Sequence, residues 1–293
     1  MKQFLSGMTA ALMLLSLAAC GQKTGAPTSE DQSIAAETVL LDAGGIVVTA
    51  TGFDADGEDG PTLLLHMENG TARDVQVFEQ DVALNGYIVD AYPCWTDADG
   101  SVFYGEPPRV PAGAAMDSRL VFNADDMARS GVTAVAEMEL SFRVDDADTW
   151  ETLLESNPVI LRTVAAETYE QTYDESGTLV YENDGVRIIV QGLETGDADW
   201  NESPGVAVYV VNLGKRDVYI TTAEAVVNDT DMTDDAFFGA EVPVGKREVA
   251  RLTFGALGSA AMLDELTVSF RITDRETGDS LAETEPVTLR WME

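Results

Sequence analysis

The chain has 293 residues, with 17 lysines and arginines against 52 aspartates and glutamates, so its formal net charge is -35. A field of that sign repels phosphate backbones and anionic headgroups, which excludes nucleic acid and an anionic lipid surface as partners. The acidity is spread along the chain, since residues 35–163 carry a net charge of -18 and residues 164–293 a net charge of -17. We expect it to serve solubility, with cation binding as the alternative.

The first 20 residues predict export from the cytoplasm. A basic Lys2 precedes an apolar run over residues 4–17, two alanines and Cys20. This layout is typical of a secretory signal peptide, and the run is too short for a transmembrane span of ~20 apolar residues. The end of the run, Leu-Ala-Ala-Cys, resembles the bacterial lipobox. That resemblance implies a signal peptide over residues 1–19, lipidation of Cys20 and an extracytoplasmic protein that is lipid-anchored to the cell membrane. The alternative is an ordinary signal peptide with Cys20 as a bystander.

The remaining length suits two domains of ~100–150 residues each. Residues 20–37 are mostly small and polar, which predicts a flexible tether that spans roughly 20 Å. We expect domain 1 over residues 38–163, a linker over 164–177 and domain 2 over 178–293.

An internal duplication sets this division. Sequence blocks recur in the same order, and the offset between them changes only where loops are expected. The matched blocks are Gly45–Val48 with Gly185–Ile188, Leu63–Asn69 with Val206–Asn212, Val110–Gly113 with Val242–Gly245, and Leu140–Arg143 with Val268–Arg271.

The matched blocks have the pattern of half-buried strands. Apolar residues alternate with polar ones over residues 136–144 and again over 266–272, and turn-forming residues separate the blocks. Seven or eight short strands per repeat predict an all-β fold of two tandem antiparallel immunoglobulin-like β-sandwiches. Phe142 and Phe270 should anchor two separate cores, which would melt separately.

One short helix is expected within this all-β pattern. It covers Asp125–Arg129, with Asn123 as its N-cap and Gly131 at its end.

Two tandem sandwiches behind a lipobox resemble the immunoglobulin-like modules of bacterial surface lipoproteins. The segment from Glu139 to Val159 is similar to one in uncharacterised secreted bacterial proteins. The Cys…Trp…Cys core of antibody domains is missing, so the resemblance implies an architecture and no activity.

Few residues offer catalytic or metal-binding chemistry. Cys94 is the only cysteine after Cys20, so we expect a small buried residue, with a reactive thiol as the alternative. His66 is the only histidine and Tyr209 is its counterpart, which favours a scaffold position over a catalytic triad or a zinc site. The loops Asp54–Gly60 and Glu194–Glu202 are expected to be solvated turns, with a loose calcium site as the alternative. We expect no metal and no cofactor.

One loop differs in length between the repeats. Between Asn85 and Val110 there are 24 residues, against 13 between Asn228 and Val242. Aromatic side chains can form a recognition surface or fold back over their own sandwich. The candidate ligand-binding residues are Tyr87, Tyr92, Trp95, Phe103 and Tyr104.

If this loop binds, the acidic charge favours a neutral or cationic protein or glycan ligand. Replacing Trp95 and Tyr104 together by alanine should then abolish binding without lowering the melting temperature.

These features predict a non-catalytic cell-envelope lipoprotein that acts as a binding or spacer module on the outer face of a membrane. The alternative is a surface-exposed hydrolase or carbohydrate-active protein with an unrecognised site. A deep pocket lined by converging polar groups would favour the enzyme.

Overall fold

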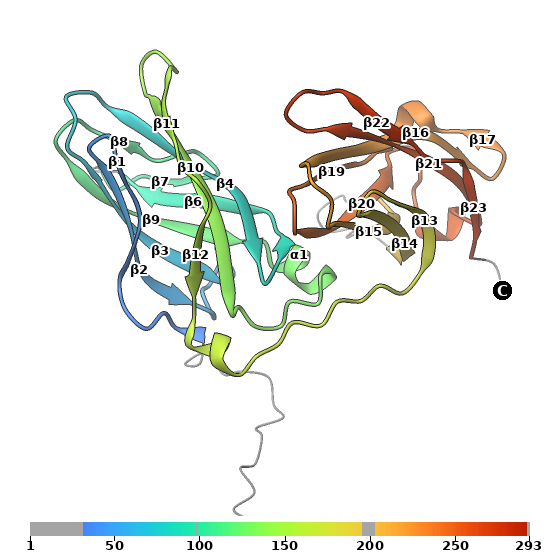
Figure 1. The fold of residues 1–293 in the computed structure, drawn as a ribbon, viewed down its shortest axis with the longest axis horizontal. Coiled ribbons are helices and arrows are strands. Elements are labelled where there is room, and N and C mark those ends of the chain that lie inside the picture. Colours follow the sequence, from blue (N-terminus) through green and yellow to red (C-terminus); the bar gives the residue numbers. More distant parts are fainter. Residues whose placement is uncertain (1–31, 98, 195–202, 292–293) are drawn as a thin grey trace, which may run out of the picture.

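A computed structural model describes residues 32–97, 99–194 and 203–291, and these are almost entirely β-structure. The expected signal peptide, Cys20, most of the tether and most of the loop Glu194–Glu202 lie outside the described residues. Within the described ranges, no helix has the length and apolarity needed to cross a membrane. The prediction of two antiparallel immunoglobulin-like sandwiches is confirmed (Figure 1).

Domain 1 is a sandwich of two layers. The first layer, sheet I, has the strand order β1-β2-β3-β9-β6-β7, and β10 pairs with β4, β11 and β12 in the second layer. The elements are β1 (Thr38–Ala43), β2 (Ile46–Asp54), β3 (Thr62–Asn69), β4 (Val75–Leu84), β5 (Tyr87–Ile88), β6 (Ala91–Thr96), β7 (Val102–Tyr104), β8 (Arg109–Val110), β9 (Ala115–Phe122), α1 (Ala124–Arg129), β10 (Glu137–Asp146), β11 (Thr152–Glu155) and β12 (Val159–Arg162).

Domain 2 repeats this plan. One layer contains β13, β14, β15 and β20, and the other, sheet III, has the order β17-β16-β21-β22 with β19 and β23 at its sides. The strands are β13 (Thr178–Asn183), β14 (Val186–Glu194), β15 (Gly205–Asn212), β16 (Val218–Val227), β17 (Thr230–Asp231), β18 (Ala236–Phe237), β19 (Gly239–Val242), β20 (Arg247–Phe254), β21 (Glu265–Asp274), β22 (Ser280–Glu283) and β23 (Val287–Arg290).

The duplication extends to irregular features of the backbone. The pairing of β2 with β3 shifts register before Gly52, and the pairing of β14 with β15 shifts before Gly192. Asn85 and Asn228 both have a positive φ, of 50° and 48°. The side-chain oxygen of each asparagine accepts hydrogen bonds from two equivalent amides at the start of the next long strand, β10 or β21. The repeats therefore share bulges and turns as well as strands.

The two domains are joined by one continuous sheet, sheet II. Its order is β11-β10-β4-β5-β20-β15-β14-β13, so strands of domain 1 run directly into strands of domain 2. Tyr87 of β5 pairs in parallel with Arg247 of β20. The Arg247 amide donates to the carbonyl of Gly86 at 2.9 Å.

The expectation of two cores, one anchored by Phe142 and one by Phe270, is confirmed, but the core of domain 1 is not confined to domain 1. The core of domain 1 includes five residues of domain 2: Ile189, Ala207, Tyr209, Val211 and Val249. The physical reason lies in β15, where all eight residues are buried because each face of the strand packs on protein. The other face of β15 packs in a core that is confined to domain 2.

The expected anchors and helix are confirmed. Phe142 lies in the shared core and Phe270 in the core of domain 2, both fully buried. Helix α1 begins after Asn123, whose side chain accepts from the amides of Asp125 and Asp126 as an N-cap should.

The segment between the domains runs along their junction (Figure 1). It starts with a 3-10 helix at Val164–Glu167. Further along, the Tyr173 hydroxyl donates to the Asn85 carbonyl at 3.2 Å, and the Arg247 guanidinium lies 3.7 Å from the centre of the Tyr173 ring. This segment therefore adds contacts to the junction.

A cleft beside an aromatic hairpin

The additional residues of repeat one form a hairpin on the edge of sheet I. Strand β6 pairs with β7 and also with β9, where its last partner is Ser118. The register places Cys94 opposite Tyr104 and Trp95 opposite Phe103. The inserted aromatics are thus held on a strand pair that extends the sheet.

Trp95 is held by its own hairpin. Its ring stacks on Phe103 with centroids 4.3 Å apart and an interplanar angle of 11°. Its indole Nε1 donates to the Glu106 carbonyl at 2.9 Å. Tyr104 is 55% exposed, whereas Tyr92 is half-buried. The structure therefore places four of the five candidate aromatics on one hairpin, with Trp95 and Phe103 on one face and Tyr92 and Tyr104 on the other, and Tyr104 is the most accessible.

Tyr87 does not belong to this group, which corrects the candidate set. It is 1% exposed. Its ring packs 5.5 Å from the ring of Tyr173 and 6.4 Å from that of Tyr209. A residue buried between the two domains is not available to a ligand.

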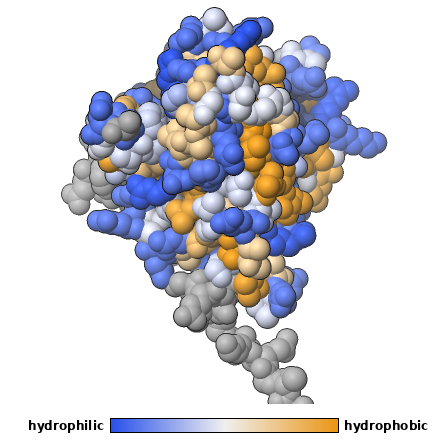
Figure 2. Space-filling view, turned by 90° about the vertical axis from the view of Figure 1, so that its left-hand side faces the viewer, coloured by the Kyte–Doolittle hydropathy of each residue, from blue (hydrophilic) through white to orange (hydrophobic). Residues whose placement is uncertain are grey.

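A cleft of about 1150 Å³ opens where β9 continues past the end of the hairpin. Its wall includes Trp95 and the stretch of β9 from Ala115 to Arg119. Apolar and polar side chains alternate on the side of domain 1 that faces away from domain 2 (Figure 2). The cleft is open and lies along a sheet edge, so it differs from the deep polar pocket expected of an enzyme.

Cys94 lies in the wall of this cleft but is itself buried. The Arg119 guanidinium donates to its sulfur at 2.8 Å. The thiol is therefore covered, as a small structural residue is expected to be.

His66 and Asp117 form a surface pair on the outer face of sheet I, with Nδ1 and Oδ1 2.7 Å apart. The counterparts of these residues in repeat two are Tyr209 and Val249, which are buried in the shared core. The two repeats thus differ here because this face is covered in domain 2 and solvated in domain 1.

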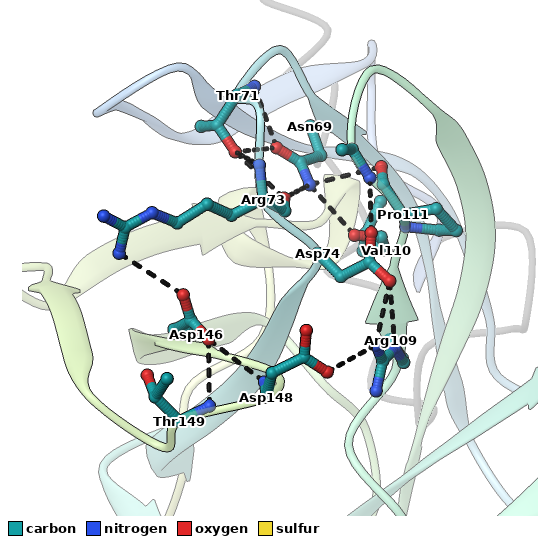
Figure 3. Close-up of polar contacts among 11 residues, drawn as sticks. Asn69, Thr71, Arg73, Asp74, Arg109, Val110, Pro111, Asp146, Asp148 and Thr149 are labelled. Atoms are coloured by element: carbon teal, nitrogen blue, oxygen red, sulfur yellow. Dashed lines mark hydrogen bonds and ion pairs between the residues drawn. The ribbon is translucent and has the colours of Figure 1, made fainter.

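A dense polar network closes one end of domain 1 (Figure 3). The Asn69 amide nitrogen donates to the carbonyls of Arg73 and Val110 at 2.7 and 2.9 Å. Asp74 accepts from the Ala112 amide and from Arg109, and these contacts hold the pKa of Asp74 below its usual value. Such a cluster of charged groups has the composition of a functional site.

The same network occurs in domain 2, which identifies it as scaffold. Contacts that recur at equivalent places in both domains are explained by a structural role that both domains share, namely closing the end of the sandwich. A ligand site would not require this repetition. The repeated contacts are Asn212 to the carbonyls of Arg216 and Val242, Arg216 to Asp274, Asp274 to the amides of Glu276 and Thr277, and Asp217 to the Val244 amide.

Ion pairs surround the domain junction. Glu194 lies between Arg129 of domain 1 and Arg251 of domain 2, at 3.0 and 2.7 Å. Arg275 reaches Asp81 at 2.6 Å, and Lys246 reaches Glu139 at 2.5 Å. These pairs connect domains that both carry a strong negative charge.

Two carboxyl groups at the junction are poorly compensated. Burial raises the pKa of Glu79 to about 7. Burial, followed by Asp90 and Asp126, raises the pKa of Glu248 to about 8. Both line a crevice of about 430 Å³ between the domains. Neither residue was singled out from the sequence. A signal was present for Glu248, since it stands where repeat one has the apolar Met116.

The acidic loops give no metal site within the ranges that the structure covers. No group of three or more aspartate, glutamate, histidine or cysteine side chains there could hold a metal ion. The Asp54 carboxylate instead accepts from the Asp56 amide at 3.1 Å, which is a local turn.

No family model and no curated protein matches the sequence. The solved structure of the YadV chaperone is 10% identical over 84% of this chain and 100% of that chain, with a TM-score of 0.24. A complex of the Salmonella enterica SafA pilin with the SafB chaperone is 14% identical over 78% of this chain and 89% of that chain, with a TM-score of 0.19. TM-scores this low carry no argument about this chain. The chain is a two-domain immunoglobulin-like β-sandwich protein.

Proposed function

We propose that this protein is a lipid-anchored, non-catalytic binding module of the cell envelope. Cys20 carries the lipid, and residues 21–31 connect it to a body made of both sandwiches. The open face of domain 1, with its cleft and Tyr104, meets a neutral or cationic protein or glycan.

The β6–β7 hairpin of repeat one supports the proposal most strongly. Within the residues that the structure describes, domain 2 completes the same sandwich without an equivalent of β6 and β7 at full length, since only the short β18 pairs with that end of β20. The hairpin is therefore not needed to close the fold. It adds a cleft of about 1150 Å³ and a Tyr104 ring that is 55% exposed.

The anchor is tested by replacing Cys20 with serine. The acyl chains would supply ~0.8 kcal/mol per buried methylene, so their loss should move the protein from the membrane fraction to the soluble fraction. Cys94→Ser is the matched control and should stay with membranes. A Cys20→Ser protein that still sediments with membranes contradicts the anchor.

The binding role is tested with a soluble protein that starts at residue 32, screened against glycans and cell-wall fragments. Tyr104→Ala should reduce any binding found at least tenfold, whereas Tyr219→Ala, an exposed tyrosine of domain 2, should not. Binding that Tyr104→Ala leaves unchanged places the site elsewhere.

A further inference from the structure

The contact between the two domains shows what the free edge at the start of strand β20 can bind. In domain 2, the start of β20 receives the β4–β5 corner of domain 1 through the bridge between Tyr87 and Arg247. The Arg247 amide provides the hydrogen bond to this corner. The edge of β20 therefore accepts a short parallel strand from another domain.

The equivalent edge in domain 1 has no such occupant. The offset between the repeats places Ala115 of β9 at the position of Arg247. Strand β9 pairs with β3 on one side from Ala115 onward, and with β6 on the other side only from Ser118 onward. In the described part of the chain, no strand pairs with Ala115, Met116 or Asp117 on the side of β6. The cleft of about 1150 Å³ lies along these three residues.

We propose that this edge binds an extended segment of a partner polypeptide, which adds to sheet I as a short strand parallel to β9. Strand addition of this kind draws its affinity from main-chain hydrogen bonds and its specificity from alternate side chains. The proposal rests on the proposed function, because it names the partner class and the binding mode of that same cleft.

The internal precedent also defines one side chain of the partner. Tyr87, at the bridge position, packs against Tyr209. The counterpart of Tyr209 in domain 1 is His66, which lies on the solvated face beside the cleft. An aromatic residue of the partner at the bridge position would therefore lie toward His66.

A second copy of this chain is disfavoured as the partner. Its candidate corner would be β16–β17, where Thr230 occupies the place of Tyr87. Residues 164–293 carry a net charge of -17 and residues 35–163 a net charge of -18, so two copies would repel each other. The pair between Lys246 and Glu139, which joins the domains within the chain, also has no equivalent, since the corresponding residues are Ala114 and Thr267. The charge instead favours a neutral or basic segment.

The test uses the chain's own docked corner as a probe. A capped peptide of residues 83–89, Ala-Leu-Asn-Gly-Tyr-Ile-Val, is titrated into the soluble protein that starts at residue 32. The backbone amide resonances of the protein are followed by NMR. We expect the Ala115 and Asp117 amides to shift and to become protected from exchange. A version with lysine in place of Ala83 should bind more tightly than one with glutamate there, and added salt should reduce the difference.

Two protein variants separate strand addition from other contacts. Ala115→Pro removes the amide donor at an exposed edge position, and should weaken binding at least tenfold. Ala115→Val keeps the donor and should bind within about twofold of the wild type. If Ala115→Pro does not fold, a peptide N-methylated after its tyrosine serves instead and should lose binding to the same extent.

If none of these peptides shifts the amide resonances at 1 mM, strand addition is overturned. Shifts that Ala115→Pro leaves unchanged also overturn it. A concentration-dependent dimer that Ala115→Pro abolishes would assign the edge to a second copy. Glycan binding that depends on Tyr104 while the peptides fail would keep the proposed function and remove only this inference.

Discussion

At the scale of single residues, the buried asparagines explain why each sandwich closes as it does. Asn69 is almost fully buried and donates to carbonyls on two separate segments, while its oxygen accepts from Thr71. An alanine there would leave these buried groups without partners, at ~1–3 kcal/mol for each group. We expect Asn69→Ala to lower the free energy of unfolding by ~3 kcal/mol in urea denaturation. The exposed Asn157→Ala should change it by less than ~0.5 kcal/mol, and equal effects of the two variants would contradict this role.

Glu248 predicts a pH dependence of stability. Its pKa of about 8 in the folded protein exceeds the value of ~4.3 for an unfolded glutamate, so the folded state binds more protons between those pH values. Its contribution to stability is therefore present below about pH 4 and is lost as the pH rises toward 8. We expect Glu248→Gln to raise the urea midpoint at pH 8.5 and to have a smaller effect at pH 5. The exposed Glu283→Gln is the control, and a gain that is the same at both pH values would show that Glu248 is ionised throughout.

At the scale of elements, the alternating strands and the capped helix could be predicted from the sequence because local pattern determines them. The junction could not be predicted from alternation alone. One signal was present, since Val206–Val211 is a continuous apolar run where the matched Leu63–Glu68 contains His66 and Glu68. A strand buried on both faces needs such a run. The place of Tyr87 depends on contacts with distant residues, so loop composition grouped it wrongly with the other aromatics.

The hairpin contacts also change what is expected of Trp95. We now expect Trp95→Ala to lower the free energy of unfolding by ~1–3 kcal/mol, because it removes a ring stack and a hydrogen bond. Tyr104→Ala should leave stability within ~0.5 kcal/mol, since that ring is mostly exposed. Thermal and urea unfolding of the two single variants measure this. An unchanged Trp95→Ala protein would mean that the stack is not formed in solution.

At the scale of the whole molecule, sheet II and the shared core make one unit of the two repeats. The ion pairs of Glu194 and Arg275 join the same two surfaces. A module of this kind would present the free face of domain 1 in a fixed orientation relative to domain 2. The two domains should therefore fold and unfold together.

Calorimetry of Phe142→Ala tests this claim most directly. Phe142 lies deep in domain 1, and its loss should cost ~3–5 kcal/mol. If the domains are one cooperative unit, the wild type and the variant each show one transition, the variant at lower temperature, with equal calorimetric and van't Hoff enthalpies. Hydrogen exchange should then show β16 and β21 of domain 2 losing protection together with β4 and β10. Two separate transitions, with domain 2 melting at its wild-type temperature, would contradict the account.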